Sequence, residues 1–133
     1  QCVSTLLTIS VHFGHLCHHE VQKTALSGRT LVNNMILGIN MNAVAEGLKL
    51  GNHYKLPQEE LFSLLKVSTG DSWVVRNWSD VSRWTAETAL AVLLKDLKAT
   101  FNEGLQHNIS LPFNALSATQ LFNSMEKEKP DAK

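Results

Sequence analysis

The sequence is short of prolines and aromatic residues, and neither sign of charge is in excess. Its 133 residues include three prolines, and twelve basic side chains balance twelve acidic ones. Because the net charge is zero, nothing in the overall charge attracts nucleic acid or an anionic membrane. No apolar run reaches the roughly 18 residues that span a bilayer. We therefore expect neither partner, and the 44% content of hydrophobic residues predicts one domain with a real core.

The first 26 residues differ in composition from the rest. They hold four of the six histidines and both cysteines, Cys2 and Cys17. A disulfide between these two would constrain only a terminus, so we expect reduced thiols and a cytoplasmic location. The segment lacks the basic start of a signal peptide, and its apolar residues from Leu6 to Leu16 recur at roughly helical spacing. We treat residues 1–26 as an atypical His-rich segment.

The histidines of this segment raise the question of a metal site. Five candidate ligands fall within eight residues, at His12, His15, Cys17, His18 and His19. A structural zinc site usually takes about four ligands and draws them from separated segments, whereas the remaining two histidines stand alone. We therefore favour a partly exposed helix and assign no metal site. A small metal-binding helical protein stays open as the least favoured alternative.

From residue 27 onward the apolar spacing predicts helices throughout. Ser27 and Gly28 precede a long helix over residues 29–50 that is apolar around most of its circumference, and Gly51 with Asn52 supplies its stop. Such a helix belongs in the middle of a bundle or in a subunit interface. Further helix starts are expected at Pro57, Asp71 and Thr85, and a helix end at His107–Asn108.

The last part of the chain completes the expected fold. Pro112 marks a loop, and Ser117 with Gln120 three residues later predicts a capping box for a final helix. Residues 126–133 form a charged tail, and no segment alternates apolar and polar residues as a strand would. The predicted fold class is all-α, a helical bundle around one long central helix, with residues 27–125 as its domain.

Common catalytic motifs are missing. There is no G-x-S-x-G nucleophile, and the seven glycines form neither a dinucleotide-binding fingerprint nor a phosphate-binding loop. What remains is a set of polar residues on otherwise apolar helices: Asn33 and Asn34 in the long helix, and Lys95 with Asp96. Each buried amide needs a partner or a ligand, because leaving it unpaired costs about 1–3 kcal/mol.

Four strings resemble, in order, the C-terminal domain of the β-hydroxyacid dehydrogenases, the family of the 3-hydroxyisobutyrate, tartronate semialdehyde and threonate dehydrogenases. These strings are SGRTLVNNM at 27–35, AVAEGLKLG at 43–51, STGDSW at 68–73 and LKDL at 94–97, and the dipeptide Leu56-Pro57 matches between the second and the third. The ordered combination is far more specific than any one string. The resemblance implies a fold like the C-terminal domain of 6-phosphogluconate dehydrogenase.

The resemblance also implies roles for particular residues. Asn34 matches the substrate-binding asparagine, and Lys95 matches a lysine that faces both substrate and cofactor. Asp96, Gly70 and Ser72 match further cofactor-binding positions. In the family a Rossmann domain binds NAD or NADP, and the helical domain closes the substrate cleft and forms a homodimer through its long helix.

One departure affects catalysis. The family places its catalytic lysine four residues before Asn34, where its ammonium can protonate or polarise the substrate oxygen, and here that position is Thr30. Arg29 is one residue off, turned by about 100° on a helix, and is a poor proton donor. We assign no catalytic residue. Residues 1–26 show no trace of Rossmann strands.

The sequence therefore predicts the substrate-cleft and dimerisation domain of an NAD(P)-dependent β-hydroxyacid dehydrogenase relative. Because the chain lacks the nucleotide fingerprint and the lysine, we expect it to be inactive alone and to bind no cofactor tightly. The alternative is a non-catalytic helical interaction module, in which the polar residues only pair with one another.

Overall fold

The chain folds into helices. The computed structural model describes the backbone of residues 2–127 and the side chains of residues 27–127. Within this part there is no strand, which confirms the predicted all-α class. In chain order the helices are α1 (Cys2–His53), α2 (Gln58–Leu65), α3 (Trp73–Arg76), α4 (Trp78–Val81), α5 (Ala89–Gln106) and α6 (Pro112–Lys127).

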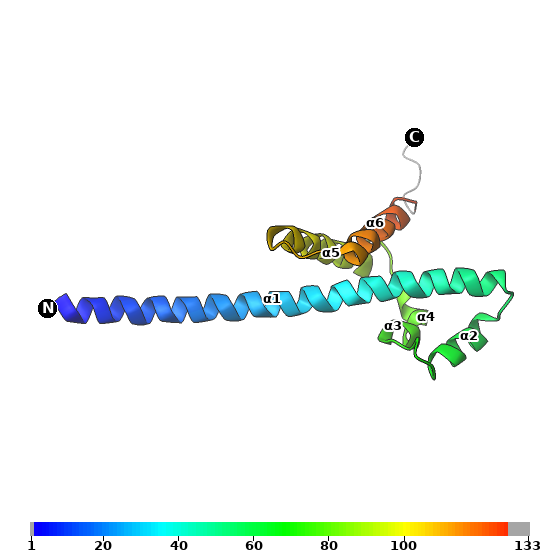
Figure 1. The fold of residues 1–133 in the computed structure, drawn as a ribbon, viewed down its shortest axis with the longest axis horizontal. Helices are drawn as coiled ribbons and strands as arrows, with labels where there is room; N and C mark the ends of the chain where they lie inside the picture. Colours follow the sequence, from blue (N-terminus) through cyan, green and yellow to red (C-terminus); the bar gives the residue numbers. More distant parts are fainter. Residues whose placement is uncertain (1, 128–133) are drawn as a thin grey trace.

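The long helix α1 is the axis of the molecule. Figure 1 shows α5 and α6 on one side of its C-terminal half and α2, α3 and α4 on the other, while its N-terminal half extends beyond the bundle. Two clusters of buried side chains meet on α1, and the partly buried Leu37 and Met41 pack against both. One is centred on Val44 and Phe62, the other on Leu93 and Leu97. A single helix thus receives apolar side chains from both sides, as its sequence predicts.

One apolar face of α1 packs inward. Leu37, Met41, Val44 and Leu48 lie in or against the core beside α2, α3 and α4. The other stripe lies at the rim, and its Val32 and Ile36 are 54% and 51% exposed. The chain therefore buries only part of the apolar circumference of α1.

Gly38 of α1 packs against Leu97 of α5. A Cβ at this position would lie 3.0 Å from both terminal methyl carbons of Leu97, a side chain that is fully buried. That distance is shorter than most carbon contacts, so glycine allows an approach that any larger residue would widen. The contact sets the spacing of the two helices at the level of the polar residues described below.

Two helices end with the left-handed residue that closes a Schellman motif. After α1 this residue is Lys55, with φ of 58°, and the Leu56 N–H donates to the Gly51 carbonyl. The predicted stop at Gly51 and Asn52 was therefore three residues early, because Gly51 instead packs against Leu61. After α5 the residue is Asn108, with φ of 56°, so the predicted end of this helix is confirmed.

Several predicted helix starts were wrong. The helix α1 runs through Ser27 and Gly28 without interruption, because it continues the helical segment that precedes them. Ser72, not Asp71, caps α3, since its hydroxyl accepts from the Val75 N–H at 3.2 Å. The residue before α5 is Thr88, whose hydroxyl bonds back to the Thr85 turn rather than capping the helix.

The last helix begins earlier than predicted. Pro112 is its first residue, a position where the missing N–H of proline is not needed. Ser117 is therefore buried in the middle of α6 rather than capping it, and Gln120 donates to Glu46 of α1 at 3.2 Å instead of closing a capping box. The capping pattern was a coincidence of spacing. None of the described helices is both long enough and apolar enough to cross a membrane.

Candidate functional site

The polar residues singled out in α1 and α5 meet between the two helices. The Nδ2 of Asn34 donates to the Oδ2 of Asp96 at 2.6 Å, across 62 residues of sequence. Asp96 is buried and Asn34 is half-buried. A carboxylate in this position needs donors, because an unpaired charge away from water is costly. The amide of Asn34 is one of them.

Lys95 supplies the second contact. Its Nζ lies 3.3 Å from the Oδ1 of Asp96, and its side chain is 74% exposed whereas that of Asp96 is 11% exposed. One oxygen of the Asp96 carboxylate therefore accepts from the half-buried amide of Asn34, and the other contacts the exposed ammonium of Lys95. The sequence prediction that Lys95 points away from the apolar stripe of α5 is consistent with this exposure.

The backbone around Asp96 is held by its neighbours. The hydroxyl of Thr100 donates to the Asp96 carbonyl at 2.8 Å, one helical turn away. The Nδ2 of Asn114, on α6, donates to the Leu97 carbonyl at 3.0 Å. Both side chains are buried. Because α1 and α6 both bond to this turn of α5, the position of the carboxylate is fixed by three helices.

Asn33 and Thr30 lie beside Asn34 on α1. Asn33 donates its Nδ2 to the Oδ1 of Asn34 at 3.0 Å, so both asparagines pair with side chains rather than with backbone. Thr30 lies one helical turn before Asn34 and is exposed. Its hydroxyl has no positive charge to offer at the position where the resemblance expects a lysine.

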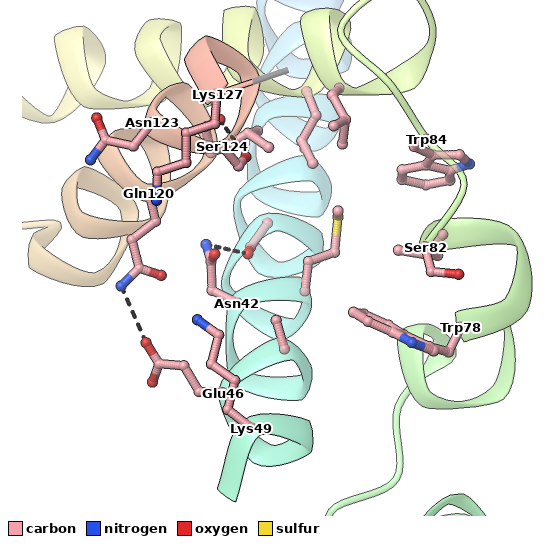
Figure 2. A pocket seen from close by; sticks show the side chains of 17 residues that line it. Asn42, Glu46, Lys49, Trp78, Ser82, Trp84, Gln120, Asn123, Ser124 and Lys127 are labelled. Carbon is pink, nitrogen blue, oxygen red and sulfur yellow. Dashed lines mark hydrogen bonds between the residues drawn. The ribbon is translucent and has the colours of Figure 1, made fainter. Parts of the chain in front are cut away.

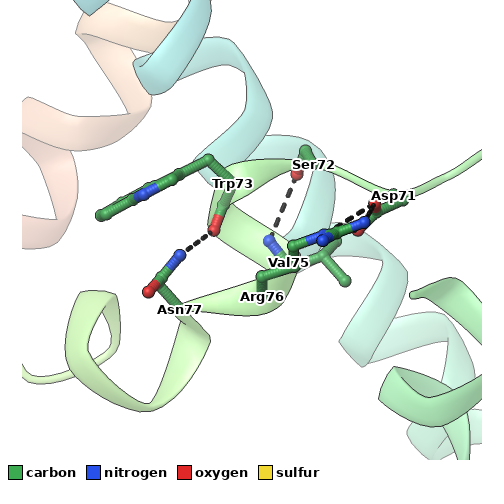
Figure 3. A network of polar contacts seen from close by, with 6 residues as sticks. All are labelled: Asp71, Ser72, Trp73, Val75, Arg76 and Asn77. Carbon is green, nitrogen blue, oxygen red and sulfur yellow. Dashed lines mark hydrogen bonds and ion pairs between the residues drawn. The ribbon is translucent and has the colours of Figure 1, made fainter.

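Gly70 and Ser72 belong to the segment between α2 and α3, and Figure 3 shows Ser72 with the polar contacts around it. The Ser72 hydroxyl is used as the cap of α3, and the Asp71 N–H donates to the Ser68 carbonyl at 3.2 Å. Within residues 27–127 no hydrogen bond or ion pair links Gly70 or Ser72 to Asn34, Lys95 or Asp96.

The same turn contains an ion pair that the sequence analysis missed. Arg76 donates from its Nε at 2.8 Å and from its Nη2 at 2.5 Å to the Oδ2 of Asp71. This hydrogen-bonded guanidinium lowers the pKa of the Asp71 carboxyl below its ordinary value. In the sequence, the signal for this ion pair was an aspartate and an arginine five residues apart, with the capping serine between them. The pair links the turn before α3 to the last residue of that helix.

The geometry can be tested against a nicotinamide dinucleotide. A pyrophosphate needs free backbone N–H groups or cations. The turn at residues 68–72 uses its Asp71 N–H internally, and the Asp71 carboxylate engages the neighbouring Arg76 guanidinium, so it offers little to a phosphate. Lys95 fits better, because its exposed ammonium keeps donors free for one anionic or hydroxyl group. No group of three or more metal-ligating side chains occurs in residues 27–127, and the His12–His19 cluster lies outside the described side chains.

Comparison with known proteins now decides the family. Residues 29–133 match the family described as NAD-binding of NADP-dependent 3-hydroxyisobutyrate dehydrogenase. The chain belongs to this family. The match includes the long helix from Arg29 and all later helices, so the resemblance stated from the four sequence strings is confirmed.

Two relatives illustrate the membership. A 2-(hydroxymethyl)glutarate dehydrogenase of Eubacterium barkeri is 31% identical over an alignment of 96 residues that covers 69% of this chain and 32% of that protein. The crystal structure of a 3-hydroxyisobutyrate dehydrogenase from Salmonella typhimurium superposes with a TM-score of 0.67 at 18% identity, covering 74% of this chain and 36% of that one. The chain thus spans about a third of the length of these relatives.

Proposed function

We propose that this member of the 3-hydroxyisobutyrate dehydrogenase family forms the substrate-facing wall of a dehydrogenase cleft, with Asn34 and Lys95 as the residues that contact a small 3-hydroxy acid. The observation that carries the proposal is the shared carboxylate of Asp96, which bonds Asn34 at 2.6 Å and Lys95 at 3.3 Å. The resemblance assigns Asn34 and Lys95 to one ligand, and both side chains contact the carboxylate of Asp96.

The contacts leave both side chains able to bind. Asn34 uses one N–H on Asp96 and accepts one bond from Asn33, so one N–H and one lone pair remain. Lys95 keeps two of its three N–H donors. An ammonium and a carboxamide with free donors suit a carboxylate and a hydroxyl on the same small molecule. Asp96 then acts as a positioning residue, because its two oxygens are already engaged.

In the proposed complex the hydride acceptor is NAD or NADP held by a Rossmann domain, as the resemblance implies. Lys95 would also face this cofactor, and its exposure supports such a contact. Roles for Gly70 and Ser72 rest on the resemblance alone. The cofactor would supply hydride transfer. Thr30 carries no amine to take the proton that the substrate hydroxyl loses on oxidation, so we propose that this chain alone binds without catalysing the reaction.

We also propose that α1 forms a homodimer. Val32 and Ile36 on α1 and Trp73 on α3 are 54%, 51% and 57% exposed. Ile36 and Trp73 line a common recess of about 340 Å³ against α1. Large apolar side chains grouped in this way favour a partner surface. Sedimentation velocity should give a dimer for the parent chain and a monomer for Ile36→Glu.

Binding tests the proposed cleft directly. In a titration with 3-hydroxyisobutyrate followed by nuclear magnetic resonance, the side-chain amide signals of Asn34 should shift, and Lys95→Gln should weaken binding about threefold to tenfold. The matched control is Lys66→Gln, which removes an exposed charge at the end of α2. Reduction of NAD or NADP should stay at background.

The alternative is a non-catalytic interaction module, and Thr30 at the lysine position favours it. Under that function the asparagines and Lys95 would only pair with Asp96. The hydroxy acid would then leave the Asn34 amide signals unchanged, or Lys66→Gln would weaken binding as much as Lys95→Gln. Either result would reject the proposed substrate contacts.

A further inference from the structure

A second cavity lies on the C-terminal half of α1, apart from the proposed substrate contacts. Its volume is about 560 Å³, which is in the range of small-molecule sites. It is formed where α1, α5 and α6 meet the segment from Trp78 to Trp84, and neither Asn34, Lys95 nor Asp96 lines it. Figure 2 shows this pocket with its polar and aromatic side chains.

The pocket has an apolar side and a polar side. Trp78 and Trp84 lie on one side of it, and Glu46, Gln120 and Lys127 lie on the other (Figure 2). Each tryptophan is half-buried and is backed by another ring: Trp78 by Phe62 at 6.2 Å and Trp84 by Trp73 at 6.4 Å between centroids. The apolar side is therefore a fixed surface that suits a flat apolar group.

The charges on the polar side favour an anion. The charged residues that line the pocket are Glu46, Lys49 and Lys127, which sum to one positive charge. The Oε1 of Glu46 already accepts from Gln120 at 3.2 Å. Among residues 27–127, no ion pair includes Lys49 or Lys127. The two ammonium groups thus keep donors for a ligand, while the single carboxylate is partly used.

One further group is available on the floor. Asn42 donates its Nδ2 to the carbonyls of Gly38 at 3.1 Å and Ser117 at 3.4 Å, which fixes the carboxamide and leaves its Oδ1 as an acceptor. Ala45, three residues after Asn42 on α1, is partly exposed and lines the same pocket. A larger side chain at this position would take up part of the pocket volume.

From these features we propose that the pocket binds a small monocarboxylate with a flat apolar body, the body on Trp78 and Trp84 and the carboxylate on Lys49 and Lys127. The site is independent of the proposed dehydrogenase function, because it shares no lining residue with the Asn34 and Lys95 contacts. A ligand there would join α1 to both halves of the bundle.

The probe for this site is 2-naphthaleneacetate, and its neutral counterpart is 2-naphthaleneethanol. In titrations of the full chain, the anion should shift the indole N–H signals of Trp78 and Trp84 and bind at least threefold more tightly than the alcohol. Lys49→Gln should weaken binding of the anion about threefold to tenfold and leave binding of the alcohol unchanged, because only the charge contact is lost. Lys66→Gln, outside the pocket, should change neither.

A second variant tests the location without changing charge. Ala45→Leu fills the floor and should weaken both probes, with its helicity and thermal midpoint close to those of the parent chain. Equal affinity for anion and alcohol, unchanged binding in Lys49→Gln, or shifts centred on the separate α5–α6 groove at Phe101 and Phe122 would overturn the proposal. The proposal would also be overturned if no signal shifted at any concentration of the anion up to its solubility limit.

Discussion

The carboxamide of Asn34 on α1 donates to the carboxylate of Asp96 on α5 at 2.6 Å, and this bond fastens the central helix to the helix that carries Lys95. Replacing Asp96 with alanine leaves the amide without its acceptor and removes the partner of the ammonium. We expect Asp96→Ala to lower the free energy of unfolding by about 1–3 kcal/mol, measured by urea denaturation.

A double-mutant cycle with Asn34→Ala isolates the bond. The coupling between the two substitutions should be about 0.5–3 kcal/mol, since the side chains are in direct contact. The control is Asp80→Ala, where an exposed carboxylate pairs with Arg83 on the surface and the loss should stay within about 0.5 kcal/mol. Additive effects of the Asn34 and Asp96 substitutions would show that the bond does not form in solution.

The core contact next to this bond predicts a larger effect. Leu97 has no exposed surface and fills the space opposite Gly38, so Leu97→Ala leaves a cavity between α1 and α5. We expect a loss of about 2–5 kcal/mol in the free energy of unfolding. Leu105, two turns later on the same helix, is 64% exposed, and Leu105→Ala should change stability by less than about 0.5 kcal/mol. Equal losses for the two variants would contradict the assigned burial.

Apolar spacing predicted the helical class and the existence of the long helix, because a stripe such as Leu37, Met41 and Val44 depends only on the helical period. Helix ends were harder to predict. Lys55 adopts the left-handed conformation after α1 although Gly51 was the better local candidate, since Gly51 is needed for packing against Leu61. Tertiary contacts thus overrode the local preference.

The candidate site was predictable in part. A lysine and an aspartate that interrupt an apolar stripe on α5, and two asparagines in an apolar helix, were visible as residues that need partners. Their pairing across 62 residues depends on how α1 packs against α5, which spacing along the chain does not encode. The pocket at Trp78 and Trp84 was missed for the same reason, because its lining comes from several separate segments.

The glycines give a matched pair of stability predictions. A Cβ added at Gly47 on α1 meets nothing within 4 Å, so Gly47→Ala should stabilise the chain by about 0.5–1 kcal/mol through the better helix propensity of alanine. A Cβ at Gly104 would lie 2.9 Å from the Ile109 carbonyl oxygen, which is backbone and cannot turn away. Gly104→Ala should therefore destabilise the folded chain. Thermal unfolding of both variants checks the prediction, and a stabilised Gly104→Ala would show that the close turn after α5 is absent.

The Asp71–Arg76 pair predicts a dependence on pH. Its guanidinium lowers the pKa of Asp71 in the folded chain, so the pair contributes stability above the pKa of an aspartate in the unfolded chain. That contribution is lost as the pH falls through the lower folded-state pKa. We expect the difference in urea midpoint between the parent chain and Arg76→Gln to be largest near neutral pH and to disappear in acid. The carboxyl carbon of Asp71 should titrate at higher pH in Arg76→Gln than in the parent chain. A stability difference that persists unchanged into acid would mean that Arg76 acts through packing instead of through this charge pair.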